Sequence, residues 1–317
     1  MARVAAIDCG TNSIRLLVAD VRTGPDGTRD LSDVHREMRV VRLGQGVDAT
    51  GRLAEEALQR TRDALVDYAE TARRAGVERT RMVATSATRD AANREDFFAM
   101  VREVLGVDAE VITGDEEARL SFIGAVGDFD PADGPFVVTD VGGGSTELVV
   151  GSWDGARAEI DAAHSADIGC VRLTERCLPN DPPPADEVAA AEQVARGILD
   201  EAFAAVDASG ARTWVGVAGT VTTLSAVAQE LPEYDPAVIH LSRLSREKLR
   251  ETTAELLSMP REERAALGPM HPGRVDVIGG GALVVRVLAD ELAERAGIGE
   301  IRVSEHDILD GIALSIG

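Results

Sequence analysis

The chain has 317 residues, of which 44% are hydrophobic, which is enough for two domains with separate cores. Its formal net charge of −22 excludes non-specific binding to nucleic acids or anionic membrane surfaces, because the long-range field repels polyanions. The first twenty residues lack a signal-peptide pattern, and no apolar run approaches the roughly 20 residues that span a bilayer, so we expect a cytoplasmic protein. The three cysteines form no C-x-x-C pair, and we expect them to be buried and unpaired.

The first half is predicted to be a sheet whose strands alternate with helices. An apolar run ending in Asp8 and a second run over 14–18 predict a hairpin at about 3–21. The elements expected next are a strand at 38–43, an amphipathic helix at 53–75, a strand at 81–85, a helix at 94–105, a strand at 109–112 and a helix at 116–126. The Asp-, Pro- and Gly-rich stretch 128–135 is expected to connect the halves.

The second half is predicted to repeat this plan. Its expected elements are a hairpin at 136–151, a strand at 158–164, an Ala-rich helix at 185–206, a strand at 213–217, helices at 219–229, 246–257 and 281–296, and a strand at 301–303. Ser304 and Asp307 have capping-box spacing, which predicts that a closing helix begins there, with His306 in its first turn. Strands and helices that alternate after each hairpin favour an α/β architecture with mixed sheets.

The two hairpins share one pattern, because residues 8–18 and 140–150 align without a gap. In each, an apolar run ends in Asp-x-Gly, passes through a turn of small residues and leaves as a second apolar run. Such a repeat predicts duplicated domains with a ligand cleft between them, and small turn residues leave backbone N–H groups bare for an anion. Glu147 aligns with Arg15, so one hairpin could hold a metal and the other a phosphate oxygen. Carboxylates beside a phosphate favour Mg²⁺ or Mn²⁺.

Four further segments are candidates for chemistry. The helix start 113–119 carries three consecutive acidic residues, more than the helix dipole needs, and one could activate an attacking water as a general base. The segment 84–89 ends a strand in small hydroxyl residues and Arg89, a pattern suited to phosphate, although a surface arginine remains an alternative. The strand–turn–helix 216–224 has bare amides at its helix start and is also consistent with an ordinary turn, as is the run 279–281.

Together these segments resemble the exopolyphosphatase and guanosine pentaphosphate phosphatase (Ppx/GppA) family, within the superfamily of sugar kinases, Hsp70 and actin. The matching segments come in the family's order and are 6–13, 42–46, 84–89, 114–119, 140–147, 169–173 and 219–223. The resemblance implies two duplicated actin-like, ribonuclease H-like α/β domains, at 1–127 and 128–303, with an active-site cleft between them. A closing helix at about 304–317 is expected to pack back on the first domain.

The resemblance implies hydrolysis of the terminal phosphoanhydride of inorganic polyphosphate, with guanosine pentaphosphate (pppGpp) as the alternative substrate. Glu117 resembles the water-activating base, Arg89 would bind the phosphate chain, and Asp140 and Glu147 resemble ligands of Mg²⁺ or Mn²⁺, with Asp8 as an additional candidate. The resemblance implies that the phosphates are lined by Gly10, Thr11, Asn12, Ser13, Gly142, Gly143, Gly144 and Ser145. Arg15, Gly219 and Thr220 are further candidates for phosphate binding. Arg274 is a candidate for a second anion or base contact, with a surface arginine as the alternative.

One departure from the family and two rival functions bear on this interpretation. Longer members carry a further C-terminal helical part resembling the HD phosphohydrolase fold, and because this sequence ends after its second domain we expect short polyphosphates or the nucleotide as substrate. An ATP-dependent sugar or acetate kinase is disfavoured because the helix start at Glu116 and Glu117 suits water as the acceptor. A non-catalytic alarmone or polyphosphate sensor is disfavoured because both the base and the metal ligands are present. A homodimer is the candidate assembly.

Overall fold

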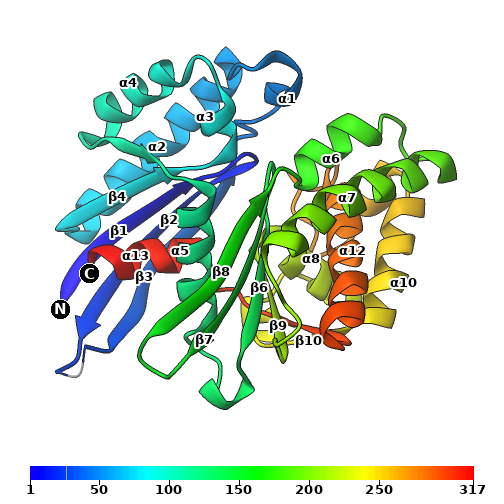
Figure 1. The fold of residues 1–317 in the computed structure, drawn as a ribbon. Coiled ribbons are helices and arrows are strands. Elements are labelled where there is room, and N and C mark those ends of the chain that lie inside the picture. The colour runs from blue at the N-terminus through cyan, green and yellow to red at the C-terminus, as the bar shows by residue number, and fades with distance from the viewer. Residues whose placement is uncertain (26) are drawn as a thin grey trace. The chain divides into compact units, whose positions relative to one another are not determined.

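The computed structural model describes residues 1–25 and 27–317. The chain divides into two compact units, each with a sheet and helices of its own (Figure 1). Unit 1 comprises 1–127, 155–157 and 306–317, and unit 2 comprises 128–154 and 158–305. None of the helices in the described ranges is both long enough and apolar enough to cross a membrane.

Unit 1 is built on a mixed five-stranded sheet in the order β3-β2-β1-β4-β5. The strands are β1 (Ala2–Cys9), β2 (Ser13–Thr23), β3 (Arg29–Val40), β4 (Arg79–Ala84) and β5 (Ala109–Val111). The hairpin of β1 and β2 is antiparallel, whereas β4 pairs with β1, and β5 with β4, in parallel. The carboxyl ends of β1, β4 and β5 therefore meet at one edge of this sheet.

Alternating side chains of β1 divide the core of unit 1 into two layers. Ala5 and Ile7 belong to the cluster under α2 (Glu55–Ala75) and α4 (Arg94–Leu105), and Val4 and Ala6 to the cluster under α5 (Gly114–Val126) and α13 (Ile308–Ile316). In Figure 1 the red helix α13 lies beside α5 on this sheet. Gly124 permits that approach, since a Cβ there would lie 1.8 Å from the carbonyl oxygen of Asp307. Two short helices complete unit 1, α1 (Val47–Thr50) and α3 (Ser86–Asp90).

Unit 2 is built on a six-stranded sheet in the order β10-β11-β9-β6-β7-β8. Its strands are β6 (Phe136–Val141), β7 (Thr146–Trp153), β8 (Ala158–Ala166), β9 (Thr213–Val217), β10 (Arg243–Ser245) and β11 (Glu300–Val303). The helices are α6 (Cys170–Cys177), α7 (Ala185–Ala205), α8 (Ala218–Ala228), α9 (Pro236–Ile239), α10 (Arg246–Ser258), α11 (Arg261–Ala265) and α12 (Ile278–Ala296), with a short 3₁₀ turn, η1 (Pro131–Asp133). A single core joins α7, α8, α10 and α12 to the sheet.

The predicted order of strands and helices is confirmed, and three local predictions are wrong. The third strand begins at Arg29 rather than Met38, because β3 is an edge strand whose polar residues hide its alternation. The capping box is formed by Asp307 and Asp310 rather than Ser304 and Asp307, so His306 precedes the closing helix. Among the cysteines, Cys9 and Cys170 are buried as expected, but Cys177 is half-buried.

Candidate functional site

The turns of the two hairpins have the same local geometry, as the sequence repeat predicts. In the first, the backbone N–H of Gly10 donates to the carbonyl oxygen of Ser13 (3.0 Å), and in the second that of Gly142 donates to the carbonyl of Ser145 (3.1 Å). Asp8 stands opposite Arg15 in one strand pair, and Asp140 stands opposite Glu147 in the other. The repeat is therefore structural, and the two hairpins differ in charge at the cross-strand position.

The first turn is held by the segment that follows β3 and by α3. The backbone N–H of Gly44 donates to the carbonyl of Thr11 (2.8 Å), and a Cβ at position 44 would lie 2.3 Å from the Thr11 Cγ2, so only glycine fits there. The hydroxyl groups of Thr11 and Ser86 lie 2.8 Å apart and share a hydrogen bond. Within the described residues, the backbone N–H groups of Thr11 and Asn12 donate no hydrogen bond. The turn thus keeps the bare amides that an anion site requires.

Behind this turn the half-buried Arg15 pairs with two buried carboxylates. Its Nε (3.0 Å) and Nη2 (2.6 Å) donate to Oδ2 of Asp8, and its Nη1 donates to Asp307 at the start of α13. Burial raises the pKa of Asp8, and Arg15 offsets only part of that effect. Asp307 is also buried, which by itself would raise its pKa, but Arg15 and the backbone N–H of Leu309 outweigh burial and lower the pKa of Asp307. The buried Oδ1 of Asp8 accepts no hydrogen bond in the described structure.

The second turn is anchored by the first residues of α6. The backbone N–H groups of Cys170 and Val171 donate to the carbonyls of Gly142 and Gly143, each at 2.9 Å. Gly169 makes this contact possible, because a Cβ there would lie 2.6 Å from the backbone of Gly143. The backbone N–H groups of Gly143, Gly144 and Ser145 donate no hydrogen bond to any described residue. This anchoring fixes the turn while its amides stay available.

Two carboxylates lie beside the second turn. Asp140 is 6% exposed and Glu147 1% exposed, and the hydroxyl of Ser165 on β8 donates to Oε1 of Glu147 (2.7 Å). The two carboxylates lie on the same face of the sheet, because Asp140 and Glu147 stand opposite each other in neighbouring strands. Ser165 stands opposite Glu147 on the next strand and lies on that face too. Buried carboxylates with oxygen donors nearby are chemically suited to a hard divalent cation.

Glu117 is the buried member of the acidic run that opens α5. Thr113 caps this helix by accepting the backbone N–H of Glu116 (3.2 Å), and Arg89 of α3 donates from Nη1 to the Ile112 carbonyl (2.9 Å) and to Oε2 of Glu117 (3.2 Å). The other donors of Arg89, Nε and Nη2, make no hydrogen bond with the described part of the chain. One guanidinium thus positions the carboxylate and keeps a free edge for an anion.

Arg274 lies against the start of α8. Its Nη1 donates to Oγ1 of Thr223 (2.9 Å), and a Cβ on Gly219 would lie 2.2 Å from its Nη2. Ala218, which begins the helix, has a φ of 69°, a left-handed conformation rare for a residue other than glycine and typical of functional turns. Burial, together with the charge of Arg274, lowers the pKa of the neighbouring His271. The structure therefore brings the predicted residues Gly219, Thr220 and Arg274 together.

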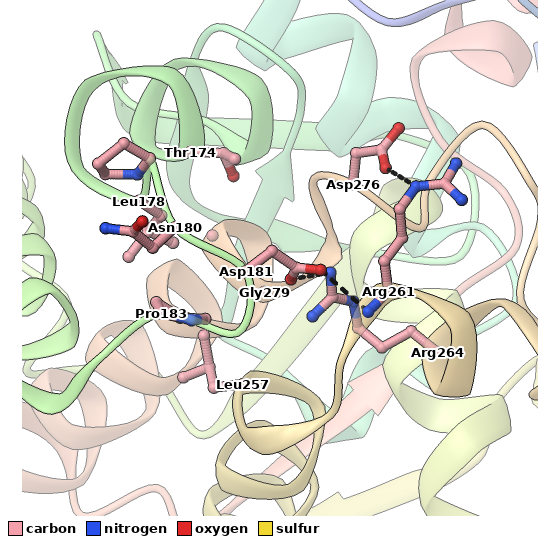
Figure 2. Close-up of a pocket in the computed structure, with 12 residues that line it drawn as sticks. Thr174, Leu178, Asn180, Asp181, Pro183, Leu257, Arg261, Arg264, Asp276 and Gly279 are labelled. Carbon is pink, nitrogen blue, oxygen red and sulfur yellow. Dashed lines mark hydrogen bonds and ion pairs between the residues drawn. The ribbon is translucent and has the colours of Figure 1, made fainter.

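The glycine run 279–281 does not form an open turn, contrary to one reading of the sequence. It opens α12 and packs against α6 and α8: a Cβ at Gly280 would lie 2.4 Å from Oγ1 of Thr174, and one at Gly281 would lie 2.6 Å from Thr220. Gly279 and Gly280 instead line a cavity of about 130 Å³. Figure 2 shows its two ion pairs, Arg264 with Asp181 (2.5 Å) and Arg261 with Asp276 (2.7 Å). Because these pairs neutralise its arginines, we assign no phosphate site there.

The comparison with protein families identifies the chain. The model of the Ppx/GppA phosphatase family matches residues 17–316. The chain belongs to this family. The predicted resemblance and the two-domain, actin-like α/β fold class are confirmed, and the protein is a phosphatase of the Ppx/GppA type.

Individual members of the family match over most or all of the chain. It is 61% identical to exopolyphosphatase 2 of Mycobacterium tuberculosis (strain H37Rv), over 100% of this chain and 99% of that protein. It is 33% identical to guanosine-5'-triphosphate,3'-diphosphate pyrophosphatase of Photobacterium profundum, over 84% of this chain and 52% of that protein. A crystal structure of an exopolyphosphatase-like protein matches with a TM-score of 0.93 and 45% identity, covering 100% of this chain and 99% of that one.

Sequence reasoning did not predict four contacts that hold the predicted site residues in place. They are Ser86 at Thr11, Ser165 at Glu147, Thr223 at Arg274 and Asp307 at Arg15. Strand alternation could have indicated Ser165, which stands opposite Glu147. Nothing in the local sequence links Asp307 to Arg15, since they are 292 positions apart.

Proposed function

We propose that the protein hydrolyses the terminal phosphoanhydride of short inorganic polyphosphates and releases orthophosphate, with Glu117 as general base. The observation that carries the proposal is the pairing of a buried Glu117 with an arginine that retains free donors. The 61% identity to an exopolyphosphatase over the whole chain supports the substrate class. Hydrolysis needs an acceptor for the proton of water, and a buried carboxylate fixed by a neighbouring cation is suited to that role.

Binding of the phosphates is assigned to amides and arginines rather than to overall charge. The bare N–H groups of the two turns, 10–13 and 142–145, offer directional donors to phosphate oxygens. Arg89 and Arg274 supply cations whose planar guanidinium groups match phosphate geometry. We propose that each turn can bind a phosphate group of the substrate within its own unit. Phosphoryl transfer asks mainly for such positioning and charge neutralisation.

A divalent metal fits the carboxylates of the proposed site. Asp140 and Glu147 are buried and face each other across two strands, and Oδ1 of Asp8 is buried without a hydrogen-bond partner in the described structure. An orphaned buried oxygen of this kind is one that a metal-bound water or the metal itself would satisfy. We assign Asp140 and Glu147 as the metal ligands in unit 2, and Asp8 stays a separate candidate ligand in unit 1. When bound, Mg²⁺ or Mn²⁺ would neutralise charge on the transferred phosphoryl group.

The second candidate substrate is pppGpp, which the identity to the Photobacterium profundum pyrophosphatase favours. It shares the terminal phosphoanhydride, so the same base and the same phosphate donors would serve. A cytoplasmic location and a homodimer stay predictions.

Orthophosphate release tests the proposal directly. We expect release from tripolyphosphate that depends on added Mg²⁺ and is lost in Asp140→Asn, while Asp161→Asn, an exposed carboxylate on β8, keeps wild-type turnover. The proposal fails if the wild-type protein releases no orthophosphate from polyphosphates or pppGpp at any metal concentration. The metal assignment fails by itself if Asp140→Asn keeps both its turnover and its metal dependence.

A further inference from the structure

An open cavity of about 430 Å³ adjoins Arg89 in unit 1 and is not used by the proposed reaction. It is lined by Arg89, by Arg94, Glu95 and Phe98 on the first turns of α4, and by residues 111–113 at the end of β5. Its wall is shared with the site, since Arg89 donates to the Ile112 carbonyl and to Glu117. A molecule whose terminal phosphate lies at Glu117 could therefore pass Arg89 and place its other end in this cavity.

The lining is only partly suited to phosphate. Phe98 is half-buried and packs edge-on against Phe97, with ring centroids 6.2 Å apart, and Val111 and Ile112 add aliphatic surface. An inorganic polyphosphate has no apolar part that such a surface could bind. A carboxylate in the lining, Glu95, repels phosphate as well.

The two charged residues of α4 in the cavity have no side-chain partner in the part of the chain that the structure describes. Arg94 and Glu95 are exposed, and neither makes a hydrogen bond or an ion pair with any described residue, in contrast to most arginines of unit 1. They are adjacent in the sequence, and Phe98 lies one helical turn further along. The cavity thus combines a planar cation, an aromatic ring and a free carboxylate.

We propose that this cavity binds the guanosine of a guanosine polyphosphate substrate. A base of a single-stranded nucleotide is typically held by stacking on an aromatic ring or an arginine plane and by hydrogen bonds to its Watson–Crick edge. Phe98 and Arg94 provide the stacking surfaces. Guanine presents N1–H and an exocyclic N–H side by side, which match the two oxygens of the Glu95 carboxylate, whereas adenine presents an acceptor beside its amino group. The inference rests on the proposed function, because it assumes that the phosphates are held at Arg89.

The proposal is tested by comparing kcat/KM for different substrates in variants that leave the proposed phosphate-binding residues unchanged. We expect kcat/KM for GTP to exceed that for ATP in the wild-type protein, and Glu95→Gln to reduce this ratio about tenfold, the usual discrimination of one bidentate contact to a base. Arg94→Gln is expected to reduce kcat/KM for GTP several-fold. Neither variant should change kcat/KM for tripolyphosphate, which does not reach the cavity, and Glu103→Gln on the same helix should change nothing.

Three results would overturn the proposal. The first is a GTP-to-ATP ratio that Glu95→Gln leaves unchanged. The second is a loss with tripolyphosphate as large as that with GTP, which would mean that the cavity holds a phosphate chain. The third is equal binding of GDP, by calorimetry, to the wild-type protein and Glu95→Gln. GDP binding needs no hydrolysis, so it tests the cavity even if the protein turns over no substrate. A lack of turnover would count against the proposed function alone and not against the cavity.

Discussion

Replacing Glu117 by glutamine removes the proposed proton acceptor and leaves its surroundings in place. Glutamine has the same length, and its amide oxygen can still accept Nη1 of Arg89, which lies 3.2 Å from the carboxylate. The Ile112 carbonyl, 2.9 Å from the same nitrogen, continues to hold the guanidinium. We therefore expect Glu117→Gln to fold normally and to bind substrate with an unchanged KM.

The expected loss of kcat separates a general base from a merely positioning carboxylate. A general base contributes about 10²–10⁴ in rate, or about 2.7–5.5 kcal/mol of barrier. Weakening the hydrogen bond between Arg89 and Glu117 would cost only about 1 kcal/mol, roughly fivefold. A fall in kcat beyond a hundredfold thus requires the chemical role.

The assay is orthophosphate release from tripolyphosphate over a range of concentrations, with Glu116→Gln as the matched control. Glu116 is the neighbouring carboxylate, is half-buried, and pairs with Arg81 (2.6 Å), which also pairs with Glu110 (2.8 Å). Removing one partly exposed ion pair outside the site has a small effect, so the control should stay within about twofold of wild type. The reasoning is refuted if Glu116→Gln is the more damaging substitution, or if Glu117→Gln changes KM alone.

Two further substitutions test the second unit. Gly219→Ala should displace Arg274, because its Nη2 would lie 2.2 Å from the new Cβ. We expect KM to rise about three- to tenfold in steady-state kinetics, with kcat and Tm nearly unchanged. The control Gly210→Ala, whose Cβ would meet nothing within 4 Å, should leave KM unchanged. Asp290→Asn should destabilise the fold by about 2–3 kcal/mol in urea unfolding, because it removes a buried carboxylate that pairs with three partly exposed arginines. Burial alone would raise the pKa of Asp290, but hydrogen bonds from Arg246 and the charges of the other arginines outweigh burial and lower the pKa. The ionised carboxylate therefore stabilises the folded state fully above about pH 3.9, the ordinary pKa of an aspartate. As the pH falls further, the difference in unfolding free energy between wild type and variant should disappear.

The duplicated hairpin could be predicted from sequence because everything that defines it is local. Strand alternation, the Asp-x-Gly ending and the small turn residues lie within eleven positions, and the register then fixes the cross-strand partners of Asp8 and Asp140. For the same reason the helix 94–105 and the strand 213–217 have the predicted bounds. Periodic segments with clear breakers leave few alternative structures.

The rest depends on contacts that local patterns do not contain. Both Ser304 with Asp307 and Asp307 with Asp310 have capping-box spacing, and tertiary packing of α13 on α5 selects the second pair. The partner of Arg15 comes from that same distant helix start. Arg89 was expected either to bind phosphate or to be a surface arginine. The structure adds its hydrogen bond to Glu117, which depends on how β4 and β5 lie side by side.

Because the chain is strongly acidic, we expect its retention of polyphosphate to depend on the length of the polymer. A body with a net charge of −22 repels a long polyanion, and only local amides, arginines and a bound cation favour its binding. Since each further phosphate adds repulsion outside the site, we expect release after each cut, so that intermediates of all lengths appear early on gels when long polyphosphate is in excess. Raising the ionic strength from about 0.01 to 0.1 M shortens the screening length from about 30 to about 10 Å and should therefore help long chains more than tripolyphosphate. If the gels show only full-length polymer and orthophosphate, the protein retains its substrate between cuts and local binding must outweigh the repulsion along the whole chain.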